Sequence, residues 1–395
     1  MNTEREIIIR VKDGIGQIAP EIWDACANSD PARYNPFLSH AFLHALEASG
    51  CVSRRTGWLP QHLVIEDWDG GLLGAMPLYL KSHSQGEYVF DHGWADAYER
   101  AGGTYYPKLQ SCVPFTPVTG ERLLTGAHEN AEAIETALMN GAVELVKRHG
   151  ASSLHITFLP EDEWQRHASS RVLQRTDQQF HWVNHGFGSF DDFLGELASR
   201  KRKALKKERR EAVADGITIE HITGAGITEA HWDAFYEFYQ DTGSRKWGNP
   251  YLNRRFFGMI GASMPERILL IMCKREGRYI AGALNIIGGD TLYGRYWGAI
   301  EHHPFLHFET CYYQAIDYAI AHGLGRVEAG AQGEHKLARG YLPQTTYSLH
   351  YLAHPGLSRA VAAYLEQERC AVAEQARMLT ELGPFKKSEA EDGEA

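Results

Sequence analysis

The sequence predicts an α/β (α+β) protein built from two copies of one unit, each a mixed sheet flanked by helices. Its 395 residues correspond to two or three domains. The order strand, hairpin, loop, helix, strand occurs in the first half and again in the second. A helix that returns the chain to one more strand is typical of α/β folds. Two predicted hairpin strands also align, residues 74–78 (GAMPL) with residues 282–286 (GALNI).

Composition excludes several classes of protein. Hydrophobic residues make up 44% and charged residues 23%, as in ordinary globular proteins. The net charge of −10 disfavours a protein that coats nucleic acids, so any anion site is local. No run of 18 apolar residues occurs, and residues 1–12 lack the apolar stretch of a signal peptide. Six scattered cysteines without a CxxC pair indicate reduced thiols in a cytoplasmic protein.

The first half contains strands and helices in alternation. Alternating residues predict a strand at 6–11, and Pro20 opens a predicted helix. The turn Asp69-Gly70-Gly71 predicts a hairpin. Residues 88–120 are rich in aromatic residues, Gly and Pro, and we expect a ligand-binding loop there. The other expected elements are helices at 20–28, 36–49 and 128–149 and strands at 62–66, 72–80 and 153–159.

A change of composition separates the halves. Residues 199–211 (SRKRKALKKERRE) hold eight basic and two acidic residues, a local charge of +6, and predict a helix. In the second half we expect helices at 229–242, 253–262, 309–322 and 357–382 and strands at 217–222, 268–274, 279–287, 291–299 and 326–329. The predicted divisions are a first domain at 1–190, a basic linker helix at 191–215, a second domain at 216–356, a helix at 357–385 and a disordered tail at 386–395.

Several motifs with known chemistry are absent from the sequence. It contains no GxxxxGK[ST], GxSxG or HExxH motif, and no GxGxxG after a predicted strand. These absences argue against P-loop NTPases, serine α/β-hydrolases, zincins and dinucleotide oxidoreductases.

The first polar cluster lies at residues 294–316, where a strand carrying Arg295 leads to a predicted helix at Glu309. The N-terminus of a helix offers free N–H groups to a phosphate or an oxyanion, and Glu309 there is a candidate general base. The alternative is that Glu309 only stabilises the first helical turn. His302, His303 and His307 suggest a metal, but Pro304 prevents the helical spacing of ligands, so we expect none.

The second cluster follows the last strand, in residues 328–352. Glycines frame a turn that carries His335, Lys336 and Arg339. Lys336 and Arg339 are spaced to hold a phosphate or carboxylate together, and His335 is suited to move a proton near neutral pH. The alternative is a solvated turn with ordinary charges. Lys246 and Trp247 form a further candidate wall of a binding site, and Trp247 is equally explained as core packing.

These stretches together resemble one family. The basic helix and the sequences RKWG, LYGRYWG, FLHFETCYYQ and AGAQGEHKLARGYLP resemble the FemAB-like branch of the GNAT acyltransferase superfamily. The resemblance implies tandem GNAT-like domains and the attack of an amine on an activated acyl or aminoacyl carbonyl. The turn at 336–340 matches the family's lysine-containing turn, Tyr312 lies on the matching helix, and Tyr105 lies in a matching loop on the acceptor side.

The resemblance leaves the donor open. The pyrophosphate loop of ordinary GNAT enzymes is missing between residues 301 and 309, so acyl-CoA and aminoacyl-tRNA both remain candidate co-substrates, with no tightly bound cofactor. The basic helix at 199–211 suits tRNA or an anionic membrane surface, and its alternative is a solvated linker. We therefore expect a cytoplasmic protein and leave a peripheral position at the inner membrane face open.

The function expected is an N-acyltransferase that forms an amide without a covalent enzyme intermediate. Its acceptor would be a cell-envelope precursor or a long-chain, sphingoid-type amine. The alternative is a non-catalytic module that binds a cell-wall or lipid precursor. The candidate catalytic residues are Glu309 and His335, and the candidate substrate-binding residues are Lys336, Arg339, Arg295, Tyr312, Lys246, Trp247 and Tyr105.

Overall fold

Two compact units make up the chain in the computed structural model, which describes residues 8–67, 70–246, 250–330 and 333–386. Unit 1 comprises residues 1–177 and 345–373, and unit 2 comprises residues 178–344 and 374–395. Each unit is therefore assembled from two separate stretches of sequence. These limits do not coincide with the contiguous domains expected above, whose boundaries at 190, 215, 356 and 385 stay predictions.

Unit 1 contains a small sheet and a larger one. The small sheet has the order β1-β3-β4, and the strands of the larger one follow the order β2-β5-β6-β7-β14. β6 and β7 pair in parallel and β7 and β14 antiparallel, which brings the late segment from Thr345 into this unit. The bounds are β1 (Ile9–Lys12), β2 (Trp58–Pro60), β3 (His62–Glu66), β4 (Leu72–Met76), β5 (Tyr79–Lys81), β6 (Lys108–Ser111), β7 (Ser153–Leu159) and β14 (Leu342–Leu352).

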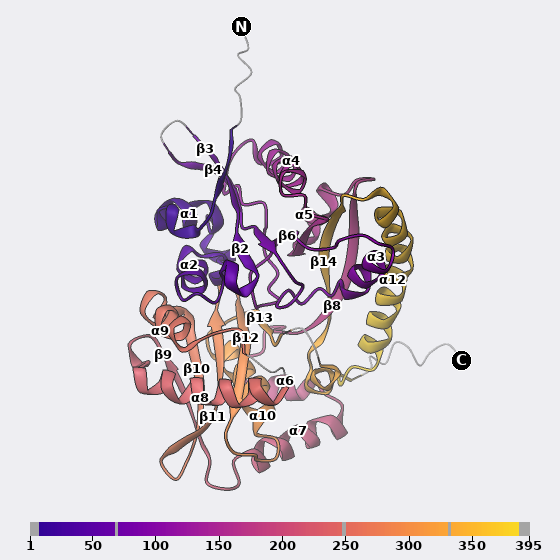
Figure 1. Cartoon of the computed structure of the whole chain (residues 1–395). Coiled ribbons are helices and arrows are strands. Elements are labelled where there is room, and N and C mark those ends of the chain that lie inside the picture. Colours follow the sequence, from indigo (N-terminus) through magenta and orange to yellow (C-terminus); the bar gives the residue numbers. More distant parts are fainter. Residues whose placement is uncertain (1–7, 68–69, 247–249, 331–332, 387–395) are drawn as a thin grey trace, which may run out of the picture. The chain divides into compact units, whose positions relative to one another are not determined.

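The main helix of unit 1 is α4 (Ala131–His149), which packs on β3, β4 and β7 (Figure 1). Its apolar residues Ile134, Leu138 and Val146 recur at helical spacing and are buried against these strands. The remaining helices are α1 (Pro20–Ala27), α2 (His40–Ala48), α3 (His92–Arg100), α5 (Glu161–Arg166) and α12 (Pro355–Glu381), whose residues from Glu374 on belong to unit 2.

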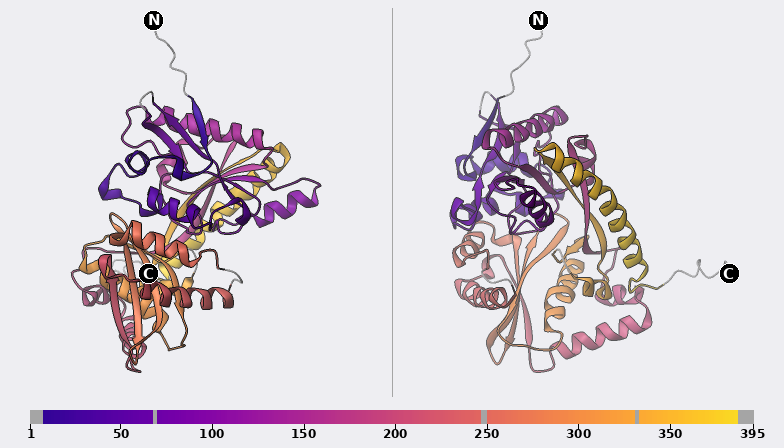
Figure 2. Two further views of the ribbon diagram at one scale, coloured as in Figure 1. Left: turned by 60° about the vertical axis from the view of Figure 1, so that its left-hand side comes forward. Right: turned by 45° about the vertical axis from the view of Figure 1, so that its right-hand side comes forward.

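Unit 2 is a mixed sheet between two layers of helices, with the strand order β8-β13-β12-β11-β10-β9. Helix α8 packs on β11 and β12, and α11 packs on β12 and β13; Figure 2 shows these helices on opposite sides of the orange strands. The strands are β8 (Val172–Val183), whose residues up to Asp177 belong to unit 1, β9 (Thr218–Thr223), β10 (Ile268–Arg275), β11 (Arg278–Ile287), β12 (Thr291–Ala299) and β13 (Arg326–Glu328). The helices are α6 (Phe190–Glu196), α7 (Ser199–Ala212), α8 (Glu229–Lys246), α9 (Arg254–Ser263), α10 (Leu306–Phe308) and α11 (Gln314–Ala321).

Several expected elements differ from the structure. The strand expected at 72–80 is two strands, β4 and β5, and the helix expected at 36–49 is a 3₁₀ turn followed by α2. Residues 88–120 are not a loop throughout, because they contain α3 and β6, and most of residues 108–118 are buried. The helix expected at 309–322 begins at Leu306 and contains a π-helical turn, Glu309–Tyr313, before α11. Such turns insert one residue into a helix and are frequent at functional sites.

Candidate functional site

The candidate site lies in unit 2, where two neighbouring strands stop pairing. β12 and β13 pair in parallel up to Tyr293, which lies opposite Glu328. Gly294 and Tyr296 then lie opposite consecutive residues of β11, so Arg295 is the additional residue of a β-bulge. Bulges bend a strand and redirect side chains, and they are common beside active sites.

A turn framed by glycines follows β13. Gly330 and Gly333 have positive φ values of 77° and 125°, and Gly340 ends the 3₁₀ helix Glu334–Arg339 with φ 85°. These conformations suit glycine, because a β-carbon would introduce strain. The turn folds Lys336 inward, so that its side chain is buried and its Nζ donates to the carbonyl oxygen of Gly330 at 2.9 Å.

Burial and the positive charge of Arg295 lower the pKa of Lys336 to about 7. A lysine in this range is present in both protonation states near neutral pH. Arg295 itself pairs with Glu328, with Nη2 and Oε2 3.1 Å apart and both side chains buried. His181 of β8 lies 3.9 Å from the other oxygen of Glu328. The turn lysine therefore lies in a buried cluster with Arg295, Glu328 and His181.

His335 lies beside Lys336 and is exposed. Its Nε2 is 2.8 Å from the hydroxyl of Tyr312, which belongs to the π-helical turn. Burial raises the pKa of Tyr312, so its hydroxyl keeps its proton. The rings of His307 and Phe308 lie 6.2 Å and 5.9 Å from the His335 ring. An accessible imidazole is thus held between a tyrosine hydroxyl and two rings.

Arg339 ends the same turn but is directed away from Lys336. Its guanidinium pairs with Glu208 of α7 at 2.9 Å and lies 3.4 Å from the centre of the Phe308 ring. It also donates to the carbonyl oxygen of His335 at 2.7 Å. Lys336 and Arg339 therefore do not lie together as the shared anion site expected from the sequence, because Arg339 pairs with a carboxylate.

Glu309 is buried in a separate ion pair. Arg209 of α7 donates to both of its oxygens, at 3.0 Å and 3.2 Å, and Gln314 donates to one of them at 2.7 Å. Burial raises the pKa of Glu309 in spite of Arg209. Both oxygens of this carboxylate accept hydrogen bonds, and the carboxylate anchors helix α7. This geometry therefore does not support Glu309 as the general base.

Two of the expected binding residues cannot be placed. Trp247 lies outside the described residues, and the side chain of Lys246, the last residue of α8, is not described either. Of the three histidines weighed as metal ligands, His303 lies between Glu301 and Asp215, at 2.9 Å and 3.2 Å. Within the described ranges, no three His, Cys, Asp or Glu side chains gather as a metal site requires.

Tyr105 lies in unit 1, inside a network of buried charges, and it is fully buried. Its hydroxyl donates to Asp91 at 2.8 Å and lies 3.2 Å from Nε2 of His155. Lys108 donates to Asp91, to Glu87 at 2.7 Å and to a serine hydroxyl at 2.7 Å. Tyr105 is thus part of this buried network, and its role as a contact for substrate stays a prediction.

The same network contains two neutral histidines. Nδ1 of His155 is 2.7 Å from Nδ1 of His350, and both rings are buried. Burial lowers the pKa of His155 to about 3 and that of His350 well below its usual value.

These histidines are expected to make the protein labile in acid. The unfolded chain binds protons at about pH 6.5 but the folded network does not, so stability falls as the pH falls below that value, by about 1.4 kcal/mol per pH unit for each histidine. Urea unfolding between pH 7 and pH 5 measures this slope. His92→Gln, at an exposed position, is the control and keeps the slope; a flat profile in the unaltered protein would contradict the assignment.

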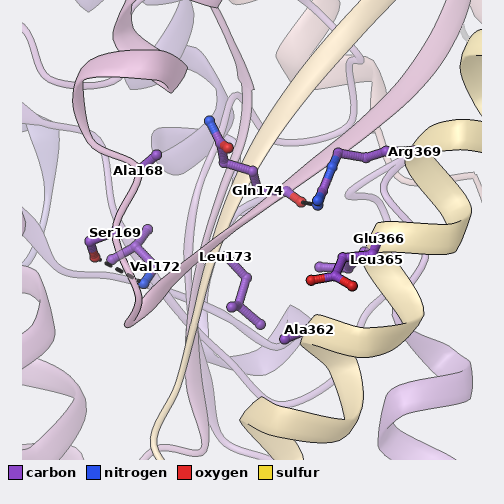
Figure 3. Close-up of a pocket in the computed structure, with 9 residues that line it drawn as sticks. All are labelled: Ala168, Ser169, Val172, Leu173, Gln174, Ala362, Leu365, Glu366 and Arg369. Carbon is purple, nitrogen blue, oxygen red and sulfur yellow. Dashed lines mark hydrogen bonds between the residues drawn. The ribbon is translucent and has the colours of Figure 1, made fainter.

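Unit 1 also has a cavity of about 330 Å³ between the start of β8 and helix α12. Leu173 and Leu365 line this cavity, and Arg369 donates a hydrogen bond to the carbonyl oxygen of Gln174 (Figure 3). The two atoms of this bond are 2.6 Å apart. None of the residues expected to bind substrate lines it. Its mixed lining does not define a class of ligand.

Comparison with known families identifies the class of this protein, an acyltransferase. A family model described as peptidoglycan biosynthesis/recognition matches residues 14–387. The chain therefore belongs to the FemAB-like family, and the family and enzyme class expected from the sequence are confirmed.

Solved structures agree with this fold. FemX matches with a TM-score of 0.54 at 15% identity, over 87% of this chain and 98% of FemX. L-PGS from Bacillus licheniformis matches with a TM-score of 0.50 at 8% identity, over 84% of this chain and 98% of that protein. A conserved protein of unknown function from Bacteroides thetaiotaomicron matches with a TM-score of 0.52 at 11% identity, over 87% and 100% of the two chains. No curated protein sequence matches this chain.

The expected fold class, two GNAT-like domains with mixed sheets flanked by helices, is confirmed. Among the described residues, no helix combines the length and apolar character needed to cross a membrane.

Proposed function

We propose that the chain is an N-acyltransferase whose reaction takes place at the β12 bulge and the turn carrying His335 and Lys336. The observation that supports this most strongly is the position of an exposed histidine and a buried lysine of lowered pKa at the point where β12 and β13 stop pairing. A strand that has lost its neighbour presents backbone groups to a ligand, and two titratable groups beside it can serve proton transfer and charge stabilisation.

The reaction joins an amine to an activated acyl or aminoacyl carbonyl. The amine nitrogen forms the new C–N bond, and the bond from carbonyl to carrier, a thioester or an ester, breaks. In the proposed mechanism Nε2 of His335 carries the hydrogen and donates it to the oxygen of Tyr312. Nδ1 then takes the proton from the attacking nitrogen and passes it to the leaving carrier. Protonated Lys336 stabilises the oxyanion of the tetrahedral intermediate. No covalent enzyme intermediate is required.

The carrier of the donor is proposed to be a polyanion that docks on helix α7. The buried apolar residues of α7 are Leu205 and Ala212, and Glu208 and Arg209 pair with the body of unit 2. The exposed cations of this helix are Arg200, Lys201, Lys203, Lys206, Lys207 and Arg210. A cationic face whose apolar residues point inward suits an RNA phosphate backbone better than a membrane, where apolar side chains would insert. Aminoacyl-tRNA is therefore the donor favoured over acyl-CoA.

The acceptor is proposed to be an amine of a cell-envelope precursor, of a peptidoglycan or lipid type. This proposal follows from the family, described by peptidoglycan biosynthesis/recognition. A long-chain, sphingoid-type amine is the other acceptor that the chemistry allows. A cytoplasmic enzyme that reaches the membrane face, at least transiently, would meet either acceptor.

The proposed reaction is tested by direct detection of the amide. Aminoacyl-tRNAs and acyl-CoAs of several chain lengths are each incubated with amine acceptors and the unaltered protein, and products are identified by mass spectrometry. His335→Gln is expected to lower the turnover by about 10²-fold or more. The control is His302→Gln, at an exposed position outside the site, which keeps the turnover. Saturable binding without any product would instead indicate a binding module.

A further inference from the structure

Helix α7 reaches the reacting turn through one acidic residue, Glu208. This residue lies among Lys206, Lys207, Arg209 and Arg210, yet its carboxylate is directed inward, with 18% of the side chain exposed. One of its oxygens accepts a hydrogen bond from the hydroxyl of a buried tyrosine, Tyr313, and both accept from Nη2 of Arg339, at 2.9 Å and 3.1 Å. A single carboxylate thus joins the π-helical turn to the turn that carries His335.

One partner of Glu208 contacts His335, and the other lies next to a residue that does. Arg339, which is buried, donates from Nη1 to the backbone carbonyl oxygen of His335 at 2.7 Å. Tyr313 directly follows Tyr312, whose hydroxyl lies 2.8 Å from the His335 ring. The backbone of His335 is therefore held through Arg339, and its ring is held through the π-helical turn.

We infer that Glu208 is a positioning residue that fixes the orientation and the tautomer of His335. Without its carboxylate, the buried Arg339 guanidinium loses its counter-charge and Tyr313 loses its acceptor, so both supports of His335 become free to move. Displacement of a catalytic group by about 1 Å can lower turnover by about 10²-fold. The inference rests on the proposed function only for the effect on turnover.

Two variants of α7 test this role, Glu208→Gln and Glu211→Gln. Both remove one negative charge from the same helix, but Glu211 pairs with Lys207 at 3.7 Å on the helix surface. The first readout needs no substrate: ¹⁵N NMR of labelled histidine, with His335→Gln to assign the signal. We expect one tautomer of neutral His335, with hydrogen on Nε2, in the unaltered protein and in Glu211→Gln, and a mixture in Glu208→Gln.

The second readout separates turnover from binding. Glu208→Gln is expected to lower kcat about tenfold or more while KM for both substrates stays within about twofold, and Glu211→Gln is expected to leave both constants unchanged. Tyr313→Phe, which removes only one of the two supports, gives a smaller change and guards against a variant that fails to fold. A His335 signal that is the same in Glu208→Gln as in the unaltered protein would overturn the inference. A changed signal in a protein that forms no amide would instead count against the proposed function alone.

Discussion

Replacing Lys108 by alanine is expected to destabilise the protein by about 3–5 kcal/mol, because it leaves the buried Asp91 carboxylate without its counter-charge. Glu87 keeps a second lysine, Lys81, at 3.5 Å. Lys108 is fully buried, and its three N–H donors meet Glu87, Asp91 and Ser84. Burial acts to lower the pKa of Lys108, but the carboxylates of Glu87 and Asp91 outweigh it and raise that pKa. Urea unfolding at pH 7 measures the loss. Lys147→Ala, at a lysine that is 62% exposed, is the control and changes stability little.

A second set of variants separates charge from packing. In Lys108→Met with Asp91→Asn, one charge of each sign is removed, and Glu87 keeps Lys81 at 3.5 Å as its counter-charge. We expect the combined variant to recover a large part of the stability lost in Lys108→Ala, since uncharged groups of similar volume often replace a buried ion pair without loss. An alanine variant as stable as the unaltered protein would show that Lys108 is not the counter-charge of this network.

Local sequence predicted the bounds of two elements almost to the residue. The strand expected at 153–159 is β7 with the same bounds, and the basic helix expected at 199–211 is α7 with one more residue. β8 and β14 were missed, although they are long. The sequence of β8, VLQRTDQQFHWV, is largely polar in its middle and carries no regular alternation of apolar residues. The discontinuous units follow from β14, whose pairing with β7 joins residues far apart in the sequence.

Local sequence also predicted part of the site. Glycines on both sides of the turn singled out His335 and Lys336, and the structure confirms that a 3₁₀ helix between glycines carries them. Their roles stay predictions. The contribution of Glu208 could not be found, because one acid within a run of lysines and arginines is typical of a solvated helix. Glu328 did leave a signal, an acidic residue at the end of a short buried strand, and its partner Arg295 had been singled out.

Replacing Lys336 by methionine is expected to lower turnover by about 10²-fold, because the oxyanion loses its cation. The pH profile tests the charge directly. Since the pKa of Lys336 is about 7, the protonated form is lost as the pH rises through that value, and the turnover of the unaltered enzyme is expected to decline on the alkaline side. In Lys336→Arg the guanidinium stays charged, so this alkaline decline disappears even where the turnover is low. An unchanged alkaline limb in Lys336→Arg would remove Lys336 from this role.

The Lys336→Met substitution is also expected to stabilise the fold. The pKa of Lys336 is about 7 in the folded protein and 10.5 in the unfolded chain, so between these values only the unfolded chain binds the proton. Stability due to this residue therefore rises with pH across that window, by up to about 1.4 kcal/mol per pH unit. Lys336→Met lacks this dependence: it is more stable than the unaltered protein at pH 7, and the difference narrows toward pH 10. Urea unfolding of both proteins at pH 7, 8.5 and 10 measures the difference in the free energy of unfolding. Contributions from other titrating groups cancel in this difference, and the exposed Lys203→Met is the control.

A reacting lysine that is buried at a cost to the fold predicts that Lys336→Met gains stability and loses turnover. If Lys336 only held the turn in place, the variant would lose both stability and turnover.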